Sequence, residues 1–271
     1  MRLFFVYLIA VPALVSAYTL FMFKPSFDSM LINGEPIDAD GKVVVKKSNL
    51  CTEAAGSALG LVEREIEIAE GFSVIISEQQ PEIDEYLERK TIVDPFGTIL
   101  WPGAIAGCRV LRKMHLEKGT RVMVLGCGVG LEVKAVSQLG LIPIAVDYNK
   151  ELFELLVYDG VETVRLDLTS DDELPMSDVV MACDCLYSEA TASALAVRLG
   201  RMIEEGRKVL VTDSQRFHSK LFLKLLNDEL DRLGKGGVLR WRKIDLKGVR
   251  VRGVTDSGVR DSDITVNLLT A

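Results

Sequence analysis

The stretch from Arg121 to Asp147 constrains the fold of this chain more than any other. It reads RVMVLGCGVGLEVKAVSQLGLIPIAVD, with an apolar run near each end and glycines directly after the first run. An apolar run, a glycine turn, an amphipathic segment and a second apolar run that ends on an acid are typical of a βαβ unit. The two strands of such a unit are parallel, and ligands bind at their carboxyl ends.

The spacing of the glycines indicates which ligand this turn could hold. Gly126, Gly128 and Gly130 follow the pattern G-x-G-x-G, and Leu131 stands where a dinucleotide fingerprint has its third glycine. The Gly-Lys-Ser/Thr of a phosphate-binding loop is also missing. Asp147 comes 21 residues after Gly126, a spacing suited to an acid that accepts ribose hydroxyls. Together these features indicate an adenosine ligand without a pyrophosphate, S-adenosyl-L-methionine; a tight turn without a ligand is the alternative.

Length, net charge and cysteine content limit which domain architecture and which substrates this chain can have. The chain has 271 residues, of which 48% are hydrophobic, which fits one α/β domain. Its net charge is −7, and its most basic stretch, Arg240 to Arg252, alternates basic and apolar residues as an exposed strand does. We therefore expect a protein or small-molecule substrate rather than nucleic acid. The five cysteines form no C-x-x-C pair, so neither a zinc site nor a disulfide framework is expected.

The N-terminus has the pattern of a targeting segment. Residues 3–23 are apolar, a positive charge precedes them, and small residues occupy the positions that favour cleavage after Ala17. Residues 1–17 are predicted to be a signal peptide or, if uncut, a signal anchor, because residues 3–23 are long enough for membrane attachment. The chain would then enter the secretory pathway or an organelle; Tyr18 at the cleavage point resembles targeting to a complex plastid.

The remaining chain divides into a linker, an extension and a main domain. We expect a linker over residues 18–42, a β-rich extension over 43–90 with a hairpin that turns near Gly71, and the main domain over 91–271. Within the main domain, strands alternate with helices, which predicts a mostly parallel sheet covered on both faces. Helices are expected at 105–114, 150–156, 192–205 and 217–233, and strands at 122–125, 142–146, 163–166, 178–182, 208–211, 238–245 and 264–269.

Three segments of the main domain resemble a known family. They are DPFGTILWPGAIAG (Asp94 to Gly107), VMVLGCGVGLE (Val122 to Glu132) and ACDCLYSE (Ala182 to Glu189), and the likeness extends over roughly residues 91–233. The chain resembles the seven-strand S-adenosylmethionine-dependent methyltransferases, and within them the protein-lysine methyltransferase-like group of the calmodulin-lysine and electron-transfer-flavoprotein-β-lysine enzymes. The resemblance implies an α/β fold with a Rossmann-like seven-strand sheet, here preceded by an N-terminal β-hairpin extension.

The resemblance also implies a set of residues that bind the cofactor. The three glycines would line its methionine and ribose. Asp147 would accept the ribose hydroxyls, although it could instead cap a helix ahead of Lys150. Asp167 would meet the adenine amino group or be an ordinary loop acid. Trp101 would wall the adenine or the substrate channel, or belong to the core. Cys183 is a further cofactor-binding candidate, and its alternative is a small buried thiol.

Asp184 and Tyr187 are the candidate catalytic residues. An acid and a phenol after the fourth strand could hold the hydrogens of an amine and aim its lone pair at the methyl carbon. The expected substrate is a lysine side chain of a protein; a small amine, or a non-catalytic cofactor-binding module, is the alternative. Two features depart from the family. Val124 stands where the family has an acid, which removes one polar contact to the amino-acid end of the cofactor, and the crossover after Asp147 is short.

Overall fold

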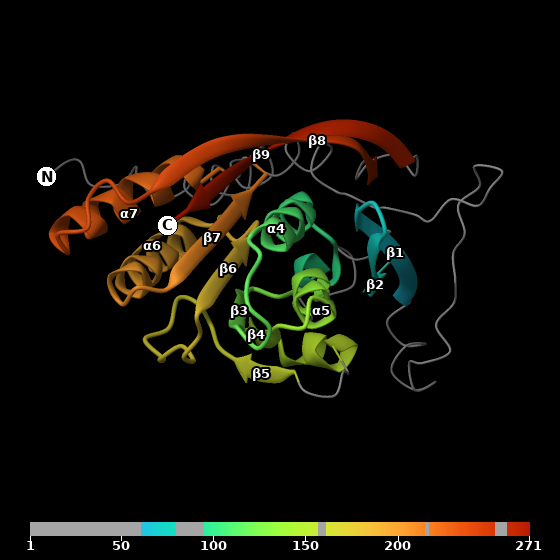
Figure 1. Cartoon of the computed structure of the whole chain (residues 1–271), viewed down its shortest axis with the longest axis horizontal. Coiled ribbons are helices and arrows are strands. Elements are labelled where there is room, and N and C mark those ends of the chain that lie inside the picture. Colours follow the sequence, from blue (N-terminus) through green and yellow to red (C-terminus); the bar gives the residue numbers. More distant parts are fainter. Residues whose placement is uncertain (1–60, 80–94, 157–160, 215–216, 253–258) are drawn as a thin grey trace, which may run out of the picture.

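A computed structural model of the chain describes residues 61–79, 95–156, 161–214, 217–252 and 259–271. Within these residues a seven-stranded sheet forms the centre of the molecule (Figure 1). From one edge to the other its strands are β5 (Glu162–Arg165), β4 (Ile142–Asp147), β3 (Arg121–Leu125), β6 (Val179–Cys183), β7 (Lys208–Asp213), β9 (Val259–Thr270) and β8 (Arg240–Arg252).

The order of the strands confirms the predicted α/β, Rossmann-like sheet. The five strands from β5 to β7 are parallel, and β9 pairs antiparallel with both β7 and β8. A separate antiparallel hairpin, formed by β1 (Leu61–Ala69) and β2 (Phe72–Gln79), confirms the predicted N-terminal extension. The chain leaves β3 toward β4 and later returns to β6 on the other side of β3. The carboxyl ends of β3 and β6 therefore border a topological switch point, where ligands bind in open α/β sheets.

Helices cover both faces of the sheet. Helices α4 (Pro102–Lys113) and α5 (Leu131–Gln138) pack on one face, in a cluster that includes the alternate strand residues Val124 and Met181. Helices α6 (Glu189–Glu204) and α7 (Ser219–Arg232) pack on the other face (Figure 1). Because side chains alternate along a strand, neighbouring residues enter opposite cores. Two short 3-10 helices, η1 (Pro95–Thr98) and η2 (Lys150–Leu156), lie before α4 and after β4.

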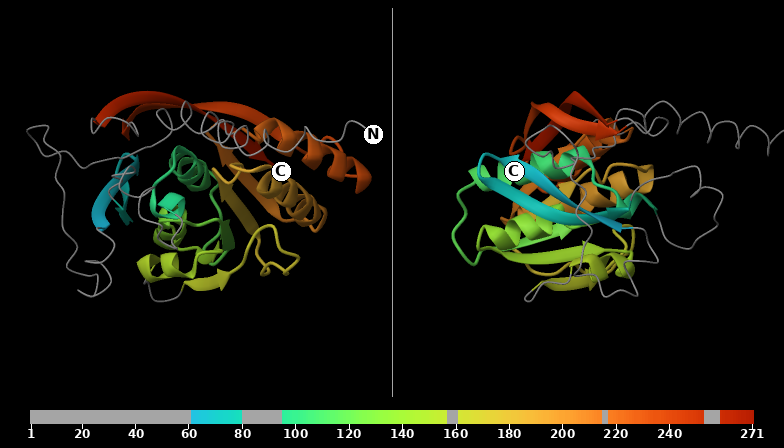
Figure 2. Two further views of the ribbon diagram at one scale, coloured as in Figure 1. Left: turned by 180° about the vertical axis from the view of Figure 1, so that it is seen from behind. Right: turned by 90° about the vertical axis from the view of Figure 1, so that its right-hand side faces the viewer.

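The β1–β2 hairpin lies outside α4 and α5, as both views of Figure 2 show. Two long cationic side chains hold it there by donating to its backbone: Lys134 Nζ bonds Ile75 O at 2.9 Å and Arg109 Nε bonds Ile68 O at 2.8 Å. The buried Arg64 forms an ion pair with Glu78 inside the hairpin. The other oxygen of that carboxylate accepts from the Leu100 amide, so the hairpin is joined to the segment that leads into α4.

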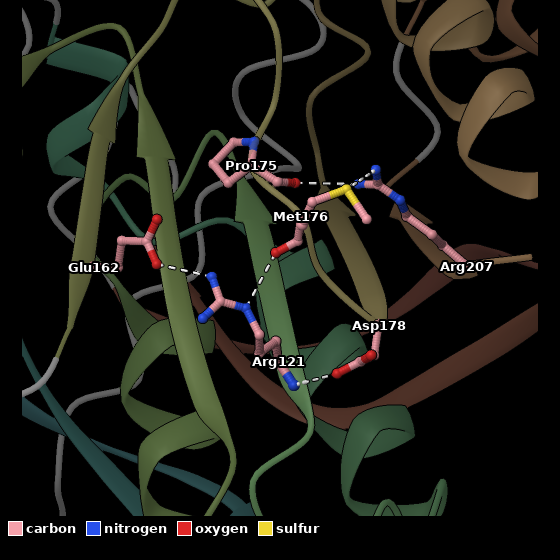
Figure 3. Close-up of polar contacts among 6 residues, drawn as sticks. All are labelled: Arg121, Glu162, Pro175, Met176, Asp178 and Arg207. Atoms are coloured by element: carbon pink, nitrogen blue, oxygen red, sulfur yellow. Dashed lines mark hydrogen bonds and ion pairs between the residues drawn. The ribbon is translucent and has the colours of Figure 1, made fainter. Parts of the chain in front are cut away.

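A cluster of polar contacts fixes the connection between β5 and β6 at the amino ends of the strands (Figure 3). Arg121 donates to Met176 O at 3.2 Å and pairs with Glu162, while its amide donates to the carboxylate of Asp178. Arg207 donates to Pro175 O at 3.1 Å. These contacts lie at the edge opposite the switch point, so they support the sheet without entering the ligand region.

The boundaries of several elements differ from the prediction. Helix α4 begins at Pro102 rather than Ile105, because proline suits the first helical position and Trp101 before it is extended. Helix α6 begins at Glu189 rather than Ala192, because the hydroxyl of Ser188 accepts from the Thr191 amide and caps the helix.

The two closing strands are also longer than predicted. They span Arg240–Arg252 and Val259–Thr270 instead of 238–245 and 264–269. The two strands pair with each other well beyond the residues of β9 that pair with β7. A register shift interrupts their pairing between Leu246 and Val249. Mutual pairing, rather than contact with the rest of the sheet, extends them.

Some predictions fall outside the described residues. These are the signal segment at 1–17, the linker at 18–42, and the part of the β-rich extension outside the hairpin. Within the part of the chain that the structure describes, no helix combines the length and apolarity that crossing a bilayer requires.

Candidate functional site

The backbone of the glycine turn between β3 and α5 has positive φ angles, which residues with a side chain rarely adopt. Gly126, Gly128 and Gly130 have φ angles of 62°, 47° and 76°. Space is restricted as well: a Cβ at Gly128 would lie 3.1 Å from the carbonyl oxygen of Gly97, and one at Gly130 would lie 1.8 Å from Leu156 Cδ2. The G-x-G-x-G spacing therefore reflects backbone geometry at each glycine.

Asp147 lies beside this turn at the carboxyl end of β4. Its buried carboxylate accepts from the Gly128 amide at 3.0 Å and from the Asn149 amide at 3.0 Å. The side chain of Asn149, not that of Asp147, caps the following helix by accepting from the Glu151 amide. The cap ahead of Glu151 is thus supplied by Asn149. The structure brings together the predicted ribose acid and the predicted glycine loop, although they come from different strands.

Asp184 joins three elements at the carboxyl end of β6. Its carboxylate is 4% exposed and accepts from the Gly103 amide at 2.6 Å, from the Ser214 amide at 2.6 Å and from the Ser214 hydroxyl at 2.8 Å. Its φ of 54° turns the chain sharply after the strand. A Cβ at Gly103 would lie 2.7 Å from this carboxylate, which explains the glycine after Trp-Pro. A negative charge at the start of α4 also complements the helix dipole.

Tyr187, the second candidate catalytic residue, lies three residues further on. It is 54% exposed, in contrast to the buried Asp184. The two residues therefore occupy different environments: the carboxylate of Asp184 is enclosed by donors of the protein, whereas Tyr187 lies at the surface. The predicted role of each toward an amine stays a prediction.

Cys183 is buried on the face of the sheet that α4 and α5 cover. Burial raises the pKa of its thiol well above the ordinary value, and a Cβ at Gly107 of α4 would lie 2.6 Å from its sulfur. The carboxyl of Glu132, in the first turn of α5, is close enough to this thiol to influence its pKa. Glu132 had no predicted role, although an acid two residues after the last glycine of G-x-G-x-G was the available signal.

The two remaining candidates lie nearer the surface. Trp101 is partly exposed, and its carbonyl accepts from the Ala104 amide at the start of α4. Asp167 is exposed and lies two residues after the end of β5. Hydrogen bonds from the amide and hydroxyl of Thr169 hold the pKa of Asp167 below its ordinary value. These contacts agree with an ordinary loop acid, and the adenine contact stays a prediction.

No family model matches the chain, and no curated protein matches its sequence. Solved structures resemble it at low identity. One is a protein of Pyrococcus horikoshii provisionally described as an RNA methyltransferase, with 13% identity, a TM-score of 0.45, and coverage of 62% of this chain and 81% of that one. A TehB-like SAM-dependent methyltransferase of Corynebacterium glutamicum has 13% identity, a TM-score of 0.41 and coverage of 68% and 96%. The magnesium protoporphyrin IX methyltransferase of Synechocystis, with bound SAH, has 16% identity, a TM-score of 0.42 and coverage of 62% and 80%. At such identities the likeness concerns the course of the chain and not its activity.

Proposed function

We propose that this chain is an S-adenosyl-L-methionine-dependent methyltransferase. The observation that carries the proposal is the contact between the Asp147 carboxylate and the Gly128 amide at the switch point of the sheet. This contact sets an acid that can accept ribose hydroxyls beside a turn that lets a ligand approach the backbone. The turn contains no Lys, Arg, Ser or Thr, which suits a nucleoside without phosphates.

The residues at the ends of β3, β4 and β6 suit the chemistry of this cofactor. When bound, this cofactor supplies a methyl group from a sulfonium. The rest of the cofactor then leaves as a neutral thioether. The protein then has to bind, orient and desolvate the acceptor rather than activate a leaving group. Two buried acids, Asp147 and Asp184, give the region the negative character that suits a cationic ligand.

We further propose that the acceptor is a lysine side chain of a protein. The resemblance of the Asp184-to-Tyr187 element to the protein-lysine methyltransferase-like group supports this, as does the exposure of Tyr187. A free lysine, whose pKa is about 10.4, is mostly protonated at neutral pH, so the acceptor amine must first release a proton to the solvent. In this proposal Tyr187 receives the amine at the surface and Asp184 attracts its charge.

Titration calorimetry tests the cofactor. We expect S-adenosylhomocysteine to bind the native chain, and Asp147→Asn to weaken that binding by roughly 10-fold or more, because one acceptor of the ribose hydroxyls is lost. Asp171→Asn, which changes an exposed loop acid, is the matched control and should leave affinity unchanged. Failure of the folded native chain to bind the ligand would reject the proposal.

Transfer of a labelled methyl group tests the acceptor. Cell extract is separated into proteins and small molecules, and a second protein sample is treated to block its lysines before incubation. Label in untreated proteins that disappears after lysine blocking supports the proposal. Label only in the small-molecule fraction would assign the chain to metabolite methylation, and label that survives the block would reject lysine as the acceptor.

A further inference from the structure

Glu132 is a buried acid directly beside the glycine turn. It is 4% exposed and lies in the first turn of α5, two residues after Gly130. The titratable groups that face it are Cys108 of α4, Cys127 of the turn, Cys183 of β6, and Asp184. None of these is a cation. Among the described residues no lysine, arginine or histidine forms an ion pair with Glu132.

Such a carboxylate is costly in the ligand-free protein. Burial, with a smaller contribution from repulsion by Asp184, raises the pKa of Glu132 from 4.5 to about 7, while the nearby amide of Glu132 and the thiol of Cys183 oppose that rise. A buried acid without a cationic partner is destabilising unless something with a positive charge comes to it. The apolar surroundings make a visiting cation with N–H donors the natural partner.

Glu132 lies on the same face of the sheet as Val124, which suggests what its carboxylate could bind. Val124, which stands where the resembling family has an acid, is fully buried on the face of the sheet beneath α4 and α5. Glu132 reaches the same side, because Cys108 and Cys183, which face it, belong to the same buried cluster as Val124. The carboxyl missing from the strand is thus present on the helix that follows the turn.

We propose that Glu132 binds the α-ammonium of the methionine part of S-adenosylmethionine and replaces the acid that Val124 lacks. The inference rests on the proposed function. The ammonium is favoured over the sulfonium because it supplies N–H donors, which a buried carboxylate requires. A contact with the ammonium is shared by the cofactor and its product, whereas a contact with the sulfonium would concern the cofactor alone.

Calorimetry with two ligands tests this contact. S-adenosylhomocysteine carries the amino-acid end, and 5′-methylthioadenosine has the same thioether nucleoside without it. We expect Glu132→Gln to weaken S-adenosylhomocysteine binding by roughly 10- to 100-fold and to leave methylthioadenosine binding unchanged. The matched control is Glu204→Gln, at an exposed position near the end of α6, which should leave both affinities unchanged.

A second measurement uses the native protein and needs no variant. At pH 6.5 the ligand amine is already charged, since an α-amino group has a pKa of about 7.7–8.0. We expect S-adenosylhomocysteine binding to release a proton from Glu132, seen as a heat that depends on the buffer, and methylthioadenosine binding to release none.

The outcomes separate the two proposals. Equal affinity of the native chain and Glu132→Gln for S-adenosylhomocysteine, or an equal loss for both ligands, would overturn the role of Glu132 while the cofactor assignment stands. Absence of proton release would also overturn it. Absence of any binding by the native chain would overturn the proposed function itself and this inference with it.

Discussion

At the scale of single residues, Asp184 connects segments that are far apart in the sequence. Its carboxylate accepts hydrogen bonds from Gly103 at the start of α4 and from Ser214 directly after β7, while Asp184 itself directly follows β6. All three contacts are to donors of the protein. Any role of Asp184 toward a substrate therefore shares the carboxylate with its role in the fold.

We expect Asp184→Asn to lower the free energy of unfolding by about 1–3 kcal/mol. Asparagine tolerates the left-handed backbone as aspartate does, so the change isolates the carboxylate. One of its two oxygens becomes an N–H₂ group, which would face a backbone amide that also donates. Urea unfolding gives the result, with Asp171→Asn as the control. An unchanged midpoint would contradict the structural role and leave a loss of turnover attributable to substrate alone.

Glu132 makes stability depend on pH in a predictable direction. Its pKa is about 7 in the folded chain against 4.5 ordinarily, so the folded state binds the proton more tightly. Stability therefore falls as pH rises from about 4.5 to about 7 in the absence of ligand. As pH rises through that interval, we expect the free energy of unfolding of Glu132→Gln to increase by up to about 3 kcal/mol relative to that of the native chain. Unfolding at several pH values measures this, and a constant difference between the two proteins would contradict it.

The burial of Glu132 could not be predicted from the sequence. Charged residues in an amphipathic segment normally face solvent, yet Glu132 and Lys134 are both buried in α5. The reason is tertiary: α4 packs on one side of α5 and the β1–β2 hairpin on another, and Lys134 donates to the hairpin. The position of Asp147 beside the glycine turn was predictable, because it depends on spacing within one βαβ unit.

At the scale of elements, the β1–β2 hairpin is held to the domain by buried polar contacts. Glu78 joins Arg64 of the same hairpin to the Leu100 amide. We expect Glu78→Gln to destabilise the hairpin by up to about 3–5 kcal/mol, because it removes the negative charge with which the buried Arg64 forms an ion pair. Hydrogen exchange of the β1 and β2 amides would show the loss as faster exchange.

The matched change for this experiment is Glu67→Gln, at an exposed position of β1, which should leave exchange unaltered. Equal exchange in the native chain and Glu78→Gln would mean that Lys134 and Arg109 suffice to hold the hairpin. The two hairpin strands themselves were predictable, since alternation around Gly71 is a local pattern.

The ends of elements were less predictable than their existence. The start of α4 depends on Trp101 and Pro102, and the start of α6 on the hydroxyl of Ser188, which are single residues rather than repeating patterns. The extra length of β8 and β9 depends on pairing between two segments whose own sequence is polar. Periodicity identifies residues that enter a core, whereas the added length of these strands comes from their pairing with each other.

At the scale of the whole molecule, residues 1–17 can be tested directly. We expect the full chain, made in cells with a secretory pathway, to be cut after Ala17 so that the mature protein begins at Tyr18. N-terminal sequencing measures this, and Ala17→Arg should block cleavage because the position before the cut requires a small residue. An intact N-terminus in a carbonate-resistant membrane fraction would instead identify an anchor, and an intact soluble chain would contradict both.

The sheet order was predictable at this scale because strands that alternate with helices have few ways to pair. Strands that alternate with helices predict a mostly parallel sheet, whereas the antiparallel pairing of β9 was not predicted. The sequence did not predict which polar residues that follow separate strands would contact each other, as Asp184 and Ser214 do.

The meeting of β3 with β6 has a consequence for how the protein folds. The glycine turn belongs to the first half of the domain and Asp184 to the second, and Val122 to Leu125 pair with Val179 to Ala182 across a long loop closure. The ligand region thus cannot exist before this distant pairing forms. A ligand should accordingly bind only late species on the folding pathway, leave the early rate of collapse untouched, and act mainly by slowing unfolding.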